Sequence, residues 1–400
     1  MTTHRCMTCG GVAIEEVPDA PVQGKPVENV VPAPAALVRP SRGTSAGPGA
    51  GPGGGGGHAG TPLEYHMLPR AGAVPEAVPL PCELHLVHIR DARDEQHNLC
   101  VTEFAGDGGD LRVIVRELHP KDMTTTNWVA RVTPDWRVED ARPASVPRVE
   151  DVRLFPYNSC CEESLWGLGV VHDGRTPPGS IRQVIFEWLD NGTQVCSYRE
   201  IPSARHEKNW MPVTGEVGPR RRFVYSVDPL VVLEYEAGQM RPSPAAIPAQ
   251  TGYVRGGSPL IPWGAGGGFL AVVHQVYRPK HEPKGGSNPL VGMGFWPTPV
   301  PDPVAGLAST VYLQQFAKFD ADLTRVELSR PFYVTRFGIE VVHGLTRWAA
   351  GGCSKEDGKV VMSVGMAELG CWLAVVEDEV VEGMFGGEGG DEGEGEEVES

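Results

Sequence analysis

The motif Val149-Glu150-Asp151-Val152-Arg153 places two carboxylates and a guanidinium within five residues. A carboxyl group whose pKa is raised can donate a proton to a leaving oxygen, so the two carboxyl groups are candidates for acid–base chemistry. Glu150 could help to raise the pKa of Asp151, although neighbouring side chains in a strand point to opposite faces. A structural alternative stays open, in which Asp151 and Arg153 form an ion pair that closes a strand end.

Two cationic groups could serve the same chemistry. Lys208, in the segment Glu207-Lys208-Asn209-Trp210, and His274, at the end of an apolar run, are suitable partners for an oxyanion. Lys208 could equally be an exposed turn residue, and His274 could be a strand-end histidine bonded to a carbonyl group. Both interpretations stay open for each residue.

The segment Arg255-Gly256-Gly257-Ser258-Pro259 predicts a turn that enters a strand. Its two glycines would let the backbone approach a ligand closely. The turn is not a P-loop, since no Gly-Lys-Ser/Thr follows it and no helix is expected. Arg255 could bind a phosphate, a carboxylate or a hydroxyl group, or it could brace Asp151 or Asp228.

Further polar and aromatic candidates lie near the C-terminal end. Glu340 and Glu368 could each accept paired hydrogen bonds from neighbouring hydroxyl groups. The indole rings of Trp263, Trp348 and Trp372 could stack on a flat ligand, although aromatic residues at such positions are more often part of the core.

The elements that must position these residues are short strands. β-rich runs are bounded by Gly, Pro, Asp or Asn, and Asp190-Asn191-Gly192 predicts a hairpin between two of them. No 12-residue amphipathic helical pattern is evident. The chain also has 51 Gly and 37 Pro, which favours many strands joined by turns. The clearest runs are 111–115, 183–188, 222–226, 269–274, 359–363 and 372–376.

The spacing of the strands predicts a propeller. Five successive segments, which are 84–147, 148–203, 204–251, 252–332 and 333–385, each contain three or four candidate strands. Propeller blades typically take roughly 40–50 residues, so five blades fit. We therefore predict an all-β, five-bladed β-propeller, with an insertion at Pro279–Pro303.

Composition divides the chain into three parts. Residues 1–78 are rich in Pro, Gly and Ala, cannot offset their ordering entropy by burial, and are predicted to be disordered. Residues 79–385 are predicted to form the propeller. Residues 386–400 are almost entirely Gly, Glu and Asp, and are predicted to form a disordered acidic tail.

Charge and cysteine content exclude some classes of protein. A formal net charge of −16 argues against a nucleic acid partner, because phosphate binding needs clustered Lys and Arg. Nine scattered cysteines indicate reduced thiols and a cytoplasmic protein, although residues 1–60 could carry a targeting signal. Cys6 and Cys9 have no second cysteine pair, which argues against a zinc site. No apolar run is long enough to span a membrane.

Four groups of segments, in this order along the chain, resemble those of a known family. The series resembles the five-bladed propellers of glycoside hydrolase family 130, the mannoside phosphorylases, and related mannosyltransferase and glycosyltransferase-associated propellers. The resemblance covers roughly 300 residues. The segments begin with 149–155, continue with 207–212 and 224–229, then 255–261 and 269–274, and end with 339–344 and 361–368.

The resemblance implies roles for individual residues. Asp151 would be the catalytic acid, although Val152 stands where the family motif has Pro. Glu368 stands where the family has Asp, so this position also departs from the pattern. Substrate-binding roles are implied for Arg153, Lys208, Asn209, Asp228, Arg255, Ser258, His274, Glu340 and Glu368.

Two hypotheses about function follow. The first is an enzyme that cleaves or forms a glycosidic bond to a mannose-like sugar, by inverting phosphorolysis or glycosyl transfer. It would need no cofactor or metal, and inorganic phosphate or a sugar nucleotide would be the co-substrate. The second is a glycan-binding propeller without catalysis, acting as an accessory to a glycosyltransferase. A weaker third is a structural propeller that binds proteins through its rim.

Overall fold

A computed structural model provides the structure of the chain. The described residues are 2–5, 12–15, 70–71, 77–90, 92, 95–103, 110–119, 124–144, 146, 149–158, 163–172, 181–189, 194–200, 209–216, 220–236, 239–242, 254–278, 311–334, 340–348, 358–366 and 370–386. The chain divides into two compact units, Met1–Leu63 and Glu64–Ser400. In the first unit, β1 (Thr2–Arg5) and β2 (Val12–Glu15) form an antiparallel pair.

The second unit contains five sheets of successive antiparallel strands, which we number as blades. Blade one comprises β6 (Glu95–Glu103), β7 (Leu111–His119), β8 (Thr124–Val132) and β9 (Val138–Pro143). Blade two comprises β10 (Val149–Asn158), β11 (Glu163–His172), β12 (Ile181–Leu189) and β13 (Gln194–Glu200). Blade three comprises β14 (Met211–Pro212), β15 (Arg221–Val227), β16 (Leu230–Glu236) and β17 (Gln239–Arg241).

Blades four and five recruit strands from the N-terminal side of the unit. Blade four comprises β18 (Val254–Gly256), β19 (Ile261–Trp263), β20 (Gly268–Arg278), β21 (Val311–Phe319), β22 (Val326–Leu328) and β23 (Phe332–Tyr333), joined by β3 (Arg70–Ala71) and β4 (Val78–Pro79). Blade five comprises β24 (Glu340–Trp348), β25 (Lys359–Met366) and β26 (Gly370–Glu377), joined by β5 (Glu83–Val87).

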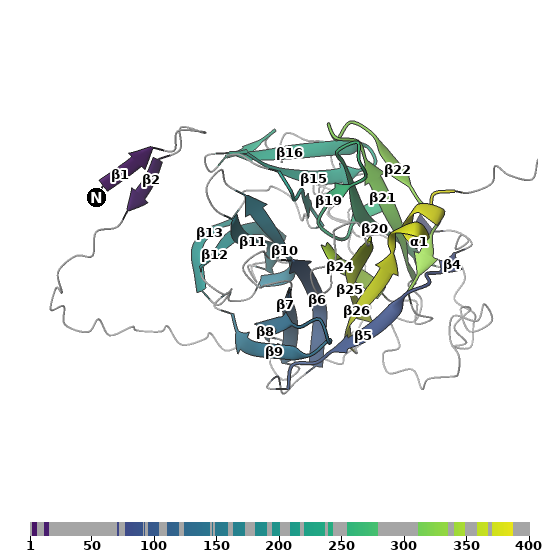
Figure 1. The fold of residues 1–400 in the computed structure, drawn as a ribbon, viewed down its shortest axis with the longest axis horizontal. Coiled ribbons are helices and arrows are strands. Elements are labelled where there is room, and N and C mark those ends of the chain that lie inside the picture. Colours follow the sequence, from purple (N-terminus) through teal and green to yellow (C-terminus); the bar gives the residue numbers. More distant parts are fainter. Residues whose placement is uncertain are drawn as a thin grey trace, which may run out of the picture. The chain divides into compact units, whose positions relative to one another are not determined.

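The five blades form a closed ring, which Figure 1 shows around a common centre. Five separate hydrophobic clusters lie between neighbouring blades, and one of them joins blade five to blade one. The first strands of neighbouring blades also touch around the centre, as β24 touches β6 and β6 touches β10. The all-β, five-bladed propeller predicted from strand spacing is therefore confirmed. All six of the strand runs named above lie within strands.

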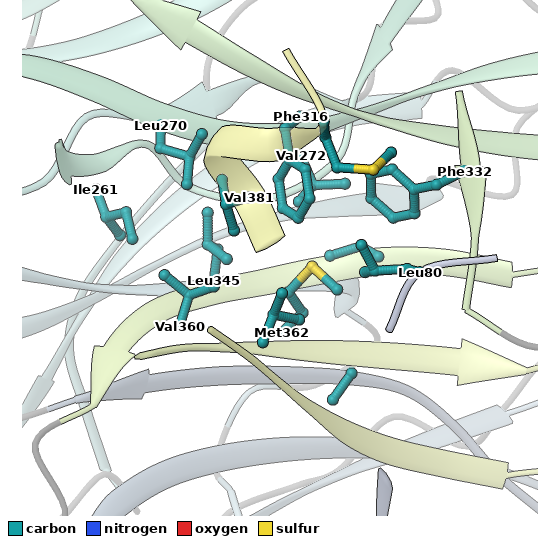
Figure 2. Close-up of a cluster of buried hydrophobic side chains, with 14 of the residues drawn as sticks. Leu80, Ile261, Leu270, Val272, Phe316, Phe332, Leu345, Val360, Met362 and Val381 are labelled. Atoms are coloured by element: carbon teal, nitrogen blue, oxygen red, sulfur yellow. The ribbon is translucent and has the colours of Figure 1, made fainter. Parts of the chain in front are cut away.

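The cluster between blades four and five illustrates how the blades are held together. Val272 and Phe316 of blade four pack with Leu345 and Met362 of blade five (Figure 2). Val381, from α1 (Asp378–Gly383), points into the same cluster. Alternate residues of each strand face the two neighbouring blades, so inner strands such as β7 and β20 are buried and largely apolar on both faces.

The strand that closes the ring, β5, belongs to a different blade from the one that the sequence predicts. The sequence places residues 84–94 in the first blade segment, but β5 pairs with β26 in blade five. This pairing joins the start of the propeller to its end and leaves no open edge at β26. Similarly, β3 pairs with β20, so chain before the predicted boundary at residue 79 belongs to blade four.

Other sequence predictions fall partly or wholly outside the described residues. These include the Pro279–Pro303 insertion, most of the two predicted tails, Cys6 and Cys9. The Asp190-Asn191-Gly192 turn is also outside, but β12 and β13 pair on either side of it as the hairpin requires. Among the described residues, no helix has the length and apolarity needed to cross a membrane.

Candidate active site

Each blade has an irregularity in or beside its first strand. Register shifts occur in β6 between His97 and Leu99, in β10 between Glu150 and Arg153, and in β24 between Val342 and Gly344. In blade four, the amides of Gly257 and Ser258 both donate to the Val272 carbonyl, at 3.1 and 3.0 Å. In blade three, Asn209 precedes β14 with φ 71°. We call these five positions the inner breaks.

Arg153 connects three of the inner breaks. Its side chain is 1% exposed. Its Nε donates to the Gly257 carbonyl at 2.6 Å, its Nη2 to Asn209 Oδ1 at 3.2 Å, and its Nη1 to the Asp151 carbonyl at 3.1 Å. Burial lowers the pKa of Arg153, and the charge of Asp151 offsets part of this effect. The predicted substrate-binding residue thus has its guanidinium committed to three neighbouring segments.

Cys100 connects the other blades. Its Sγ donates to the His343 carbonyl at 3.4 Å and accepts from the Leu154 amide at 3.1 Å. Blades five, one and two therefore meet at this thiol. Burial raises the pKa of Cys100 to about 12, so the group stays a thiol at neutral pH.

The glycines of the Arg255–Pro259 turn have a different purpose from the one the sequence suggested. A Cβ on Gly256 would collide with the Asn209 carbonyl, and one on Gly257 would collide with the carbonyls of Val272 and Val342. The expectation was close approach to a ligand, but the structure shows close approach of one inner strand to another. Small residues are needed because backbone meets backbone at the centre.

The acidic group lies on the inner break of β10. Asp151 adopts φ 49°, which Asp tolerates better than most residues. Arg116 Nη1, from β7 in blade one, lies 3.0 Å from Glu150 Oε2 and 3.8 Å from Asp151 Oδ1. The expectation that Glu150 and Asp151 face opposite ways is therefore wrong. The break in strand register removes the alternation and brings both carboxylates to one guanidinium.

Val152, which stands where the family motif has Pro, is buried at 5% exposure in the cluster between blades one and two. Its apolar side chain thus anchors the break while Asp151, whose side chain is 12% exposed, stays partly open to solvent. This arrangement gives a carboxylate that is held firmly and remains accessible.

A second group of candidates forms a row across blade four. Arg255 pairs in register with His274, and His274 pairs with Gln314. His274 is buried, and its ring centroid lies 5.8 Å from that of Tyr312. Burial lowers the pKa of Arg255, and Tyr312 offsets part of this effect. We call Arg255, His274, Gln314 and Tyr312 the blade-four row.

Two other predicted residues contribute to the fold. Glu340 is fully buried, and its Oε2 accepts the Val334 amide at 2.7 Å. The Ser258 hydroxyl accepts the Val272 amide and donates to the Pro259 carbonyl, both at 2.8 Å. These bonds fix the backbone at the start of β24 and in the Arg255–Pro259 turn.

The remaining predicted residues are an exposed carboxylate, two core indoles and two residues that the structure does not describe. Asp228 is exposed on the turn between β15 and β16. Lys208 and Glu368 lie outside the described residues. Trp263 and Trp348 are core residues at 8% exposure, and Trp263 Nε1 donates to Glu382 at 2.7 Å.

Sequence reasoning missed Arg116, Tyr312 and Gln314. A signal was present for two of them. Arg116 interrupts the apolar run of Leu111–His119, and Gln314 stands beside a second glutamine within the largely apolar Val311–Phe319 strand. Polar side chains inside such strands are buried only with a partner, which makes them candidates for a site. Within the described ranges, no cluster of His, Cys, Asp or Glu is placed to hold a metal ion.

No protein-family model and no curated protein matches the chain. Solved structures with a similar fold include the mannose phosphorylase MPT-4 from Leishmania mexicana, at 8% identity and a TM-score of 0.48, with 74% of this chain and 88% of that chain covered. The β-1,2-mannobiose phosphorylase from Listeria innocua is 11% identical with a TM-score of 0.42, covering 73% and 92% of the two chains.

A third similar structure is the catalytic domain of the GH62 α-L-arabinofuranosidase from Coprinopsis cinerea. It is 8% identical with a TM-score of 0.40, covering 76% of this chain and 95% of that chain. Similar structures thus include glycoside phosphorylases and hydrolases.

Proposed function

We propose that this propeller acts on carbohydrate, cleaving or forming a glycosidic bond to a mannose-like sugar by inverting phosphorolysis or glycosyl transfer. The observation that carries the proposal is the placement of Asp151. A partly exposed carboxyl group stands on a break in the first strand of blade two, next to Arg116 and near the centre of the ring.

The chemistry requires one carboxyl group and a site for the second substrate. Asp151 would protonate the glycosidic oxygen as the bond to the sugar breaks. An inverting hydrolase needs a second carboxylate to activate water, whereas in phosphorolysis inorganic phosphate is the nucleophile. Arg255 and His274 in the blade-four row carry a guanidinium and an imidazole, which are suited to hold phosphate, or the phosphoryl group of a sugar nucleotide.

The alternative is a glycan-binding propeller without catalysis, acting beside a glycosyltransferase. The contact of Arg116 with both Glu150 and Asp151 favours it, because an ion-paired carboxylate accepts hydrogen bonds from sugar hydroxyls but is a poorer proton donor. Val152, which differs from the family motif, also supports this alternative.

A turnover assay distinguishes the two functions. The protein is incubated with mannose-1-phosphate or GDP-mannose and sugar acceptors, and product is measured for wild type, Asp151→Asn and Asp322→Asn. Asp322 is an exposed carboxylate on the turn between β21 and β22, and therefore a matched control. A general acid contributes roughly 10²–10⁴-fold, so Asp151→Asn should lower the rate by at least about 100-fold.

Turnover that survives Asp151→Asn would remove Asp151 from the role of acid. Binding of sugar without turnover in wild type would favour the glycan-binding alternative. Absence of both binding and turnover with every sugar would contradict the carbohydrate proposal.

A further inference from the structure

In the blade-four row, the side-chain amide oxygen of Gln314 has no hydrogen-bond donor among the described residues. Residues directly opposite each other on antiparallel strands share a face, so Arg255, His274 and Gln314 lie side by side. Tyr312, two residues before Gln314 on β21, shares that face and contacts the ring of His274.

The orientation of the Gln314 amide is determined by its bond to blade five. Gln314 is fully buried, and its Nε2 donates to the Glu340 carbonyl at 2.6 Å. A carbonyl oxygen can only accept, so the atom facing it must be the nitrogen. Oε1 therefore points the other way, and within the described part of the chain it is buried without a hydrogen-bond partner.

The neighbouring residue Gln315, on the opposite face of β21, has hydrogen bonds to both polar atoms of its side chain. Gln315 Oε1 accepts from Gln275 Nε2 at 2.6 Å, and Gln315 Nε2 donates to the Ser329 carbonyl at 2.7 Å. The fold thus satisfies both polar atoms of Gln315 on the face towards blade three. It leaves one atom of Gln314 unsatisfied on the face that carries Arg255 and His274.

The chemistry of the row indicates what would fill this position. A buried amide oxygen needs a hydrogen-bond donor. A sugar hydroxyl can donate to Gln314 Oε1, whereas a fully ionised phosphate can only accept, so the phosphate proposed at Arg255 and His274 does not fill this position. Arg255 and Tyr312 are half-buried while His274 and Gln314 are buried, so the row extends from partly exposed to buried side chains.

We infer that Gln314 and Tyr312 form a subsite for a sugar hydroxyl beside Arg255 and His274, with Gln314 Oε1 as its acceptor. This inference rests on the proposed carbohydrate function and names two residues that bind the sugar. Gln314 is a specificity residue here, because an analogue lacking the hydroxyl would leave the buried acceptor unpaired.

The test uses the full chain and measures the Kd for mannose and for mannose-1-phosphate by titration calorimetry. Gln314→Met keeps the volume of the side chain and removes both the Oε1 acceptor and the Nε2 donor to the Glu340 carbonyl, and the control must therefore also lose both amide bonds. Loss of one such hydrogen bond should raise the Kd by about tenfold. The matched control is Gln315→Met, which should lower the melting temperature and leave the Kd within about twofold.

The outcomes separate the subsite from the function. A raised Kd in Gln314→Met, with Gln315→Met unchanged, supports the subsite. An unchanged Kd in folded Gln314→Met would overturn the subsite and leave the carbohydrate function standing, with a water molecule as the donor to Oε1. If wild type binds neither mannose nor mannose-1-phosphate, the subsite is overturned together with the assignment of a mannose-like sugar. Circular dichroism checks folding, and Gln275→Met replaces the control if Gln315→Met does not fold.

Discussion

At the scale of single residues, Arg153 has the strongest structural role. A buried charge is costly unless it is hydrogen bonded, and Arg153 meets that condition through acceptors on Asp151, Asn209 and Gly257. A planar guanidinium can reach three acceptors in fixed directions, which an ammonium group cannot do equally well. The inner breaks of blades two, three and four are thus held in one arrangement by one side chain.

We therefore predict that Arg153→Met destabilises the fold by at least about 3 kcal/mol, because it removes three hydrogen bonds, two of them fully buried. Arg153→Lys should have a smaller effect, since it keeps the charge and some of the bonds. Denaturant unfolding followed by fluorescence measures both. The control is Arg137→Met, which removes an exposed ion pair with Asp135 and should change stability by less than about 1 kcal/mol. Equal effects at 153 and 137 would contradict this role.

At the scale of elements, the closure of the ring depends on strands that come before blade one. β5 supplies the outer strand of blade five, and β3 and β4 extend blade four. Leu80 and Val87, in and beside these strands, are buried. The short helix α1 then covers the junction from the other end of the chain, where Arg347 pairs with Asp378 at 2.7 Å.

A pair of truncations tests this closure. A chain that starts at Glu64 keeps the second unit and should retain its melting temperature. A chain that starts at residue 89 loses β3, β4 and β5, exposes the edge of β26, and loses about 3–6 kcal/mol from Leu80 and Val87 alone. We expect it to aggregate in size-exclusion chromatography. A monomeric, cooperatively unfolding chain from residue 89 would contradict the role of β5.

At the scale of the whole molecule, burial of thiols couples stability to pH. Burial raises the pKa of Cys100 and Cys371 to about 12, and burial with the charge of Glu340 raises the pKa of Cys82 to about 11. An unfolded thiol ionises near pH 8.5. Because the folded pKa values are raised, the stability contributed by these thiols is complete below about pH 8.5 and is lost as the pH rises towards 12.

The free energy of unfolding should therefore fall above pH 8.5, with each thiol contributing up to about 1.4 kcal/mol per pH unit. Cys371 is buried in the cluster between blades five and one, and this burial raises its pKa. Cys371→Ala should therefore reduce the fall in unfolding free energy per pH unit by the contribution of one thiol. Denaturant unfolding at pH 7.5, 9 and 10.5 measures the slope. A slope identical in wild type and Cys371→Ala would show that this thiol does not contribute.

The sequence alone determined the class and repeat of the fold. Apolar runs bounded by turn residues identify strands because local propensity and alternation suffice to specify them. Their spacing then indicates five blades. The same reasoning marked Asp151, Arg255 and His274 as chemically distinctive. It could not assign β5 to blade five, because the pairing of β5 with β26 joins segments almost 290 residues apart and depends on ring closure.

Only the tertiary structure decided which of these residues act together. The inner break at Asp151 turns Glu150 and Asp151 towards one guanidinium from another blade, which alternation along a strand does not predict. Arg153 is committed to the fold because its acceptors come from two further blades. Gln314 differs from Gln315 only in the face it occupies, and the packing of blade five against that face leaves its acceptor open.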